Sequence, residues 1–326
     1  MKSKYKRKTM QDILREQLAQ QKSEDAKREQ TRLQNLLTPE LYKTLSETLT
    51  MSIEDFTKLP GANVTETSDG PVIFIDNDAD VLGVAHLDFV DWNPDPIIDQ
   101  VFATVDKTPQ LDCRLGVWVL LHLLPTLQPG VKFDVLLTDS EEVGASTAKD
   151  FETDKEYRYA FEFDRNGTDI VTYQFGDDYG LNSDPESLAW DVEAEKIANL
   201  GMGSFSDISY LQIGCKAFNI GVGYYQQHTK NCHAFLTETV QMAESFASWY
   251  FDTEGVFFPH EDKPNGNAFG YGSYGKGSTS TWQGYYAGYD DFDVEEETEC
   301  PICRCLNGGQ HLICTYCQEQ IGKQYM

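Results

Sequence analysis

The chain has 326 residues, 40% of them hydrophobic and 12% aromatic, which is enough to form the core of one large α/β domain with small appendages. It contains no run of 18 apolar residues, so we expect neither a membrane-spanning helix nor a membrane partner. Its formal net charge of −27 argues against a nucleic-acid partner, because phosphate binding needs clustered Lys and Arg side chains.

Residues 1–37 are predicted to form a polar, basic helical arm. The segment lacks Gly and Pro and has sparse apolar positions, which is typical of an exposed helix or a coiled-coil arm. Residues 1–35 hold ten Lys/Arg and five Asp/Glu, so they carry a net charge of +5 and the rest of the chain −32. The Lys-rich start continues into Gln and Glu instead of an apolar signal core. A cytoplasmic location is therefore expected, and the arm is a candidate surface for a protein partner.

Residues 38–264 are predicted to form one α/β domain. Apolar runs typical of strands alternate with helical patterns; the strand runs are 71–75, 81–87, 133–138, 159–163 and 218–224, and the helical patterns are 115–124, 185–200 and 233–251. This alternation predicts a three-layer α/β domain in which helices cover both faces of a largely parallel or mixed sheet.

Polar side chains follow these strand runs, where open α/β sheets place their ligand sites. The run 81–87 ends in His86 and Leu87 and is followed by Asp88. In this His-x-Asp sequence the imidazole can bind a metal ion while Asp88 accepts the other ring proton. Asp112 precedes an apolar helix, and it could project its carboxylate into a site or simply cap that helix. Glu141 and Glu142 follow the strand run 133–138.

Two further strand ends supply Asp164 and His228. Glu162 and Asp169 compete with Asp164, but the position at the strand end favours Asp164. His233 competes with His228, although His233 is predicted to begin a helix. The ordered set contains the ligands of a pair of zinc ions: imidazoles, a carboxylate that two ions can share and a spare carboxylate base.

The order His-x-Asp, Asp, Glu-Glu, Asp, His resembles the co-catalytic di-zinc exopeptidases. LDCRLG (111–116) is similar to the family's motif around its bridging Asp, SEEVGA (140–145) to its Glu-Glu motif, and GYYQQHT (223–229) to the segment around its last His. The likeness extends from about residue 72 to about residue 251. SFSDISYL (204–211), with Ser206 and Asp207, also resembles a segment near the family's site.

This resemblance implies a zinc-dependent metallopeptidase that cleaves a peptide or aminoacyl substrate. Asp112 would bridge two zinc ions; His86 and Asp164 would complete one zinc site, and Glu142 and His228 the other. Glu141 would be the general base and Asp88 would orient His86. Manganese or cobalt could replace zinc in the catalytic pair, and a hydroxyl of Tyr224 or Tyr225 could stabilise the oxyanion.

The spacing of the candidate residues along the chain indicates which branch of the family the sequence resembles. Consecutive candidate residues lie 26, 29, 22 and 64 positions apart, so no gap holds an inserted domain of ~100 residues. This favours the compact aminopeptidases over the tripeptidase and deacylase branch. The related glutaminyl cyclases use one zinc ion, whereas ligands for two are present here. An N-acyl amino-acid amidohydrolase and a catalytically silent partner-binding protein remain alternatives.

The C-terminal part is predicted to be a flexible linker followed by a zinc knuckle. Residues 265–299 are rich in Gly and Tyr and then acidic, which is typical of a linker. Residues 300–326 contain two C-x2-C pairs, Cys300 with Cys303 and Cys314 with Cys317, which would bind one structural zinc ion through four thiolates. Such a knuckle could cap the structure or bind a protein partner.

Overall fold

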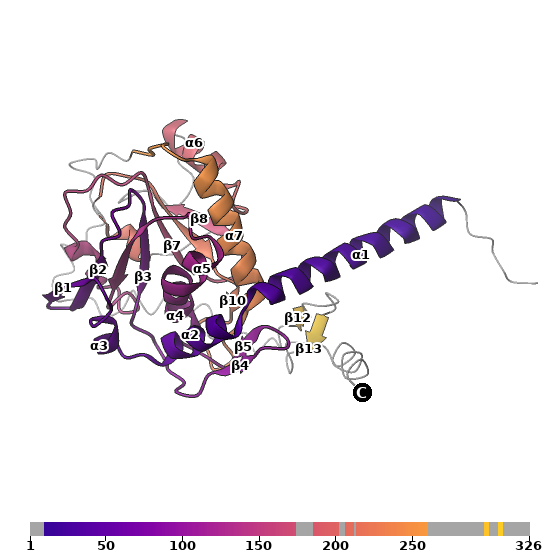
Figure 1. Ribbon diagram of the computed structural model, residues 1–326, viewed down its shortest axis with the longest axis horizontal. Coiled ribbons are helices and arrows are strands. Elements are labelled where there is room, and N and C mark those ends of the chain that lie inside the picture. The colour runs from indigo at the N-terminus through magenta and orange to yellow at the C-terminus, as the bar shows by residue number, and fades with distance from the viewer. Residues whose placement is uncertain are drawn as a thin grey trace, which may run out of the picture. The chain divides into compact units, whose positions relative to one another are not determined.

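The computed structural model describes residues 10–173, 185–201, 206–211 and 213–259, together with the backbone of 297–299 and 306–308 (Figure 1). Two compact units are present, one of residues 1–28 with 270–326 and one of residues 29–269. In the described part of the chain, no helix combines the length and the apolar character needed to cross a membrane.

The larger unit is built on a seven-stranded mixed sheet with the order β1-β2-β6-β3-β7-β9-β8. Its strands are β1 (Ala62–Thr67), β2 (Gly70–Ile75), β3 (Leu82–His86), β6 (Asp134–Thr138), β7 (Ala160–Arg165), β8 (Ile170–Tyr173) and β9 (Ala217–Gly221). β3 lies parallel to β6 and β7, and β7 lies parallel to β9, whereas β1, β2 and β8 run antiparallel to their neighbours. The prediction of an α/β domain with a largely parallel or mixed sheet is confirmed.

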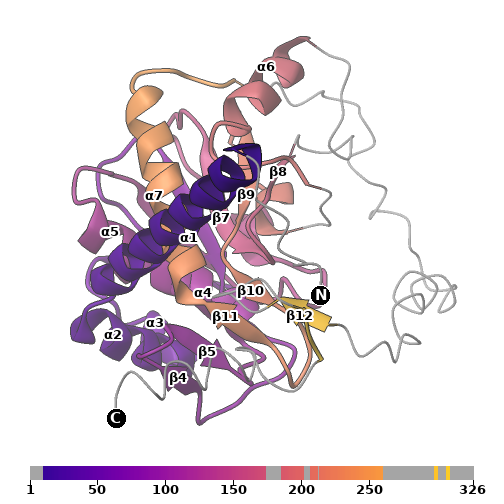
Figure 2. The ribbon, with the colours of Figure 1, turned by 90° about the vertical axis from the view of Figure 1, so that its right-hand side faces the viewer.

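Several α-helices of this unit contribute to one core, on one face of the sheet. They are α2 (Pro39–Thr50), α4 (Leu111–Trp118), α5 (Leu124–Leu127), α6 (Pro185–Ala194) and α7 (Leu236–Asp252), with a π-helical turn at Val119–Leu123 between α4 and α5. Figure 2 views this face, with α7 in front of the strands. Alternate strand residues such as Phe161 and Phe163 of β7 join the helices in the larger core.

The opposite face is covered by shorter elements, η2 (Thr147–Asp150) and η3 (Asp207–Ser209), which are single 3₁₀ turns. Val84 of β3 and Leu136 of β6 pack there against Ala148 and Ile208 in a second, smaller core. Because side chains alternate along each strand, His86 of β3 and Thr138 of β6 extend this second face toward the carboxyl ends of the strands.

A second, four-stranded sheet has the order β10-β11-β5-β4. Its strands are β4 (Ile97–Asp99), β5 (Thr104–Asp106), β10 (Tyr224–Tyr225) and β11 (His233–Phe235). The prediction that His233 begins a helix is wrong. Ala234 and Phe235 pair with β5, and α7 begins only at Leu236. This sheet joins the segment after β3 to the hairpin that carries His228.

The N-terminal helix α1 spans Met10–Leu36 and is followed by α2 and by the short α3 (Ile53–Phe56). Within the larger unit, Leu33 and Leu37 are buried in the main core. Arg32 donates two hydrogen bonds to Glu244 of α7, at 2.8 and 2.6 Å. The last turn of the predicted arm is therefore part of the larger unit.

In the smaller unit, β12 (Glu297–Glu299) pairs antiparallel with β13 (Leu306–Gly308). The last residues of the predicted linker thus pair with residues of the predicted knuckle. The four cysteines proposed as zinc ligands, Cys300, Cys303, Cys314 and Cys317, lie outside the described residues, as does most of the linker.

Candidate metal centre

The candidate residues of the α/β domain come from five different elements and meet at the carboxyl ends of the parallel strands. His86 ends β3, Asp112 lies in the first turn of α4, and Asp164 lies near the end of β7. Glu141 and Glu142 form the turn after β6, and His228 lies between β10 and β11. Parallel strands place their carboxyl ends at one edge, so residues far apart in the chain can share a site there.

The first group of side chains surrounds His86, which is 2% exposed. Its Nε2 lies 3.1 Å from Oδ1 of Asp164, and its Nδ1 lies 3.3 Å from Oδ1 of Asp88. Ligand atoms of His86, Glu141 and Glu142 also lie within 4.8 Å of one another. Burial alone lowers the pKa of His86, but hydrogen bonds to Asp164 and Asp88 outweigh it and hold this pKa well above its usual value.

The second group consists of Asp112, Glu142 and His228, whose ligand atoms lie within 4.8 Å of one another. His228 Nε2 lies 3.1 Å from Oε1 of Glu142 and 2.8 Å from Oδ2 of Asp112. The adjacent carboxylates of Asp112 and Glu142 raise the pKa of His228 to about 10. Glu142 belongs to both groups, so the two sets of ligand atoms are adjacent.

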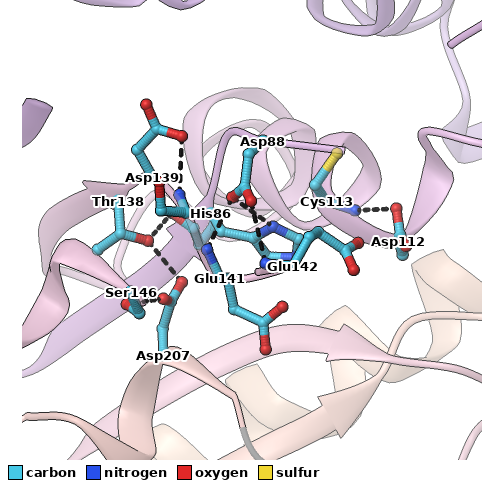
Figure 3. A network of polar contacts seen from close by, with 12 residues as sticks. His86, Asp88, Asp112, Cys113, Thr138, Asp139, Glu141, Glu142, Ser146 and Asp207 are labelled. Atoms are coloured by element: carbon cyan, nitrogen blue, oxygen red, sulfur yellow. Dashed lines mark hydrogen bonds and ion pairs between the residues drawn. The ribbon is translucent and has the colours of Figure 1, made fainter. Parts of the chain in front are cut away.

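Asp88 links the first group to the turn after β6, as Figure 3 shows. Its carboxylate accepts hydrogen bonds from the backbone N–H groups of Glu141 at 3.1 Å and Glu142 at 3.0 Å, besides its contact with His86. Burial raises the pKa of Asp88, but its bonds to His86 and to the two backbone groups lower it below the usual range. Asp88 can therefore hold the ring of His86 and the Glu141–Glu142 turn in fixed positions.

The carboxylate of Glu141 accepts no hydrogen bond from the described residues, while the backbone N–H of Glu141 donates to Asp88. Burial raises the pKa of Glu141 to about 9, and burial likewise raises the pKa of Glu142 to about 7. Neighbouring carboxylates, Asp164 beside Glu141 and Asp112 beside Glu142, raise both pKa values further. A divalent ion would favour their charged forms and reverse the direction.

The structure brings Asp164, rather than its competitors Glu162 and Asp169, to His86. Glu162 lies two residues earlier on the same strand face and is completely buried, and neither of its carboxylate oxygens has a partner among the described residues. Burial raises the pKa of Glu162 well above its usual value. Asp169 is paired with Arg165 at 2.7 and 3.0 Å.

His228, rather than His233, meets the candidate ligands. His233 is buried in β11, where its Nδ1 lies 2.9 Å from the backbone oxygen of Asn231 and its ring stacks on Tyr225. The hydroxyl of Tyr225 donates to Glu238, and that of Tyr224 donates to the backbone oxygen of Asp164. These bonds give Tyr224 a role in holding the end of β7.

Several residues support the site without having been assigned a role from the sequence. Asn219 of β9 accepts hydrogen bonds from the backbone of Asp164 and Arg165 and donates to the Asp164 carboxylate at 3.3 Å. Its position as a lone polar residue in the apolar run FNIG was a usable signal.

Asp207 is the second such residue. Buried on η3, it accepts hydrogen bonds from Thr138 at 2.5 Å and from Ser146. Burial raises the pKa of Asp207 to about 6. The sequence placed Asp207 near the site, but only the fold shows that it ties η3 to the end of β6 (Figure 3).

The backbone has a strained, left-handed conformation beside Glu141 and at His228. Ser140, next to Glu141, has φ +62°, and His228 has φ +58°. A left-handed backbone costs roughly 1–2 kcal/mol for residues other than glycine, and such strain is concentrated at functional sites. Ser140 is held by hydrogen bonds from its N–H to Asp139 and from its hydroxyl to the backbone oxygen of Asp69.

The donor set fits divalent metal ions. Oδ2 of Asp112 is buried and within ion-pair distance of His228, yet the orientation of the two groups makes no hydrogen bond to it. Buried polar atoms are almost always satisfied, so a buried carboxylate oxygen left free beside an imidazole suggests a shared cation. Imidazole nitrogens and carboxylate oxygens are ligands that zinc accepts.

No protein-family profile and no curated protein sequence matches the chain. Its fold is similar to solved structures at low identity. A tripeptidase from Staphylococcus aureus aligns with a TM-score of 0.45 and 13% identity, over 64% of this chain and 96% of the tripeptidase. The aminopeptidase PepT from Bacillus cereus aligns with a TM-score of 0.41 and 14% identity, over 69% of this chain and 97% of PepT. The TET1 peptidase of Pyrococcus horikoshii aligns with a TM-score of 0.40 and 15% identity, over 63% of this chain and 98% of the TET1 chain.

Proposed function

We propose that this protein is a metal-dependent peptidase of the exopeptidase type, most simply an aminopeptidase, with two catalytic zinc ions. The observation that carries the proposal is the meeting of two adjacent ligand groups at one sheet edge, one around His86 and one formed by Asp112, Glu142 and His228. In this assignment Asp112 would be shared by both ions, His86 and Asp164 would hold one of them, and Glu142 and His228 would hold the other. Manganese or cobalt are alternative ions.

The chain's own residues divide the chemical work. A bound pair of divalent ions would polarise the scissile carbonyl and lower the pKa of water at the site. Glu141 takes the proton of the attacking water and later delivers it to the amine of the leaving group. Asp88 holds the Nδ1 proton of His86, so that Nε2 faces the site with its lone pair.

Charge favours a substrate with a free amino terminus. The part of the chain after residue 35 carries a net charge of −32, and the site itself is lined by carboxylates. An acidic surface attracts cationic groups and repels anionic ones. A terminal ammonium is therefore preferred to the blocked amine and free carboxylate of an N-acyl amino acid.

The proposal is tested by the variants Glu141→Gln and Glu142→Gln, with metal content and kinetics measured on the same preparations. Glu141→Gln keeps the size of the side chain but removes the base. We expect it to retain both catalytic ions and lower kcat by ~10²- to 10⁴-fold, with little change in KM. Glu142→Gln should instead weaken metal binding directly.

The outcomes separate the two roles. Near-normal turnover of Glu141→Gln at full metal occupancy would reject Glu141 as the base, and loss of one ion would mean that Glu141 is a ligand. A screen of aminoacyl and N-acyl substrates with the intact protein separates an aminopeptidase from an amidohydrolase. Full metal loading without turnover of any of them would favour a catalytically silent binding protein.

For the C-terminal segment we propose a separate structural zinc site formed by Cys300, Cys303, Cys314 and Cys317. Four thiolates bind zinc tetrahedrally and can drive the folding of a short segment. The fully loaded chain should then contain about three zinc ions, two catalytic and one structural. Replacing Cys314 and Cys317 with Ser should remove one of the three and leave turnover unchanged; loss of all metal from a folded double variant contradicts two independent sites.

A further inference from the structure

Arg114 is a buried cation that forms no ion pair with any residue in the described part of the chain. It lies on α4, two residues after Asp112, and is 1% exposed. Among the described residues it forms no ion pair within 4.0 Å, and its Nε and Nη1 atoms are buried without a hydrogen-bond partner. Burial lowers the pKa of Arg114, but a guanidinium stays protonated in proteins. A charge buried in this way needs a specific compensation.

Two aromatic rings contact this guanidinium, and the carboxylates of Asp88 and Asp139 attract it from a greater distance. The guanidinium carbon lies 4.7 Å from the ring centre of Phe56 and 5.5 Å from that of Phe89. Both distances are within the range of cation–π attraction, and Arg stacks on ring faces better than Lys because its guanidinium is planar. Phe56 is fully buried at the end of α3, whereas Phe89 is only partly buried.

Phe89 directly follows Asp88, the carboxylate that contacts His86 and the backbone N–H groups of Glu141 and Glu142. Arg114 therefore connects the helix that carries Asp112 to the loop that carries Asp88. We propose that Arg114 is a positioning residue: by holding the ring of Phe89, it fixes Asp88 and thereby the metal-binding geometry of His86 and of the Glu141–Glu142 turn. This inference rests on the proposed function, because it concerns the same metal centre.

The test is Co²⁺ affinity of the full-length protein, measured by absorption in competition with a chelator. Carboxylate–imidazole and thiolate sites absorb differently with Co²⁺, so the catalytic ions are observed apart from any bound by the cysteines. Loss of a group that orients a ligand typically costs ~10- to 100-fold in metal affinity. We expect Arg114→Met to weaken Co²⁺ binding by that factor, and Arg114→Lys to restore only part of it.

The matched control is Arg158→Met. Arg158 is also buried and lies 5.3 and 5.4 Å from the ring centres of Tyr159 and Tyr250, but it is paired with Asp80 and precedes β7, at the opposite end of that strand from Asp164. This variant should lower Tm and leave Co²⁺ affinity unchanged. If Arg114→Met behaves in the same way, Arg114 is only structural and the inference is wrong.

Phe89→Leu is an independent test of whether the contact between Arg114 and Phe89 affects metal binding, because it leaves Arg114 in place and changes a partly buried residue. It should weaken Co²⁺ binding by a similar factor, and adding Arg114→Met to it should cause little further loss, because both changes remove one contact. Unchanged affinity in Phe89→Leu overturns the inference even if Arg114→Met does not fold. An intact protein that binds no Co²⁺ outside its cysteines overturns the proposed function as well.

Discussion

Neighbouring acids in this site have different surroundings and therefore different properties. Asp164 reaches Nε2 of His86, whereas Glu162, on the same face of β7, is fully enclosed and without a partner among the described residues. The pKa of Glu141 is raised to about 9 by burial, while Asp88, which lies 3.3 Å from His86, has its pKa lowered by hydrogen bonds. Burial and bonding at each atom, rather than residue type, set the protonation state.

These shifts predict how pH acts on the metal-free protein. The pKa of His228 is raised to about 10, so its contribution to stability is complete below its unfolded pKa of 6.5 and is lost as pH rises through 10. The neutral form of Glu141 is favoured in the fold, so its contribution is lost as pH rises from 4.5 through about 9. Metal-free protein should therefore become less stable as pH rises from 6 to 9.

Zinc should act in the opposite sense, because it binds the deprotonated ligands. The difference in Tm between zinc-loaded and chelator-treated protein should increase over the same pH range. Thermal unfolding at several pH values measures it. A difference that shrinks with rising pH would show that protons and metal do not compete at these side chains.

At the scale of elements, the site depends on the close approach of α4 to β7. A Cβ atom on Gly116 would lie 2.1 Å from the backbone oxygen of Phe163, so only glycine allows this contact. The helix that carries Asp112 is thereby placed against the strand that carries Asp164. The distance between these two candidate ligands is set by a residue that has no chemical role.

Gly116→Ala should therefore disturb both the packing and the metal site. Overpacking typically costs ~1–3 kcal/mol of unfolding free energy, and here the obstructing atom belongs to the backbone and cannot rotate away. We expect a lower Tm and weaker metal binding, measured by thermal unfolding and metal analysis. Gly255→Ala is the control: its position is open and has φ +72°, so it should cost about 1–2 kcal/mol without affecting metal. Equal metal content in the two variants would contradict the proposed link.

At the scale of the whole molecule, the end of α1 belongs to the larger unit. Leu33 and Leu37 are 3% and 5% exposed, and Arg32 is paired with Glu244. The domain boundary predicted at residue 38 would separate Leu33 and Leu37 from the core in which they are buried.

Two fragments test this boundary. Residues 29–264 and residues 38–264 both contain every proposed catalytic ligand, so both should bind two zinc ions and turn over substrate. The shorter fragment lacks two buried leucines, each worth about 1.5–3 kcal/mol. For a protein of this size we expect its Tm to be lower by at least ~6 °C. Equal Tm values would mean that the α1 contacts add nothing, and a metal-loaded but inactive longer fragment would show that another segment completes the active site.

The sequence by itself determined the α/β class, the main strands and the candidate residues at their ends. Strand patterns depend on near neighbours in the chain, and polar residues such as His86 or Glu141 after an apolar run mark the carboxyl edge of a sheet. The short strands β4, β5 and β11 had no such signal, because pairing between distant segments forms them. For this reason the region of His233 was mistaken for the start of a helix.

Only the tertiary structure decided which side chains meet. The order β6-β3-β7-β9 places His86 between the turn that carries Glu142 and the strand that carries Asp164, and a separate hairpin brings His228 to Asp112. The contact of Arg114 with Phe89 depends in the same way on packing between segments with no common pattern. Such meetings follow from sheet order and helix packing, which local periodicity does not specify.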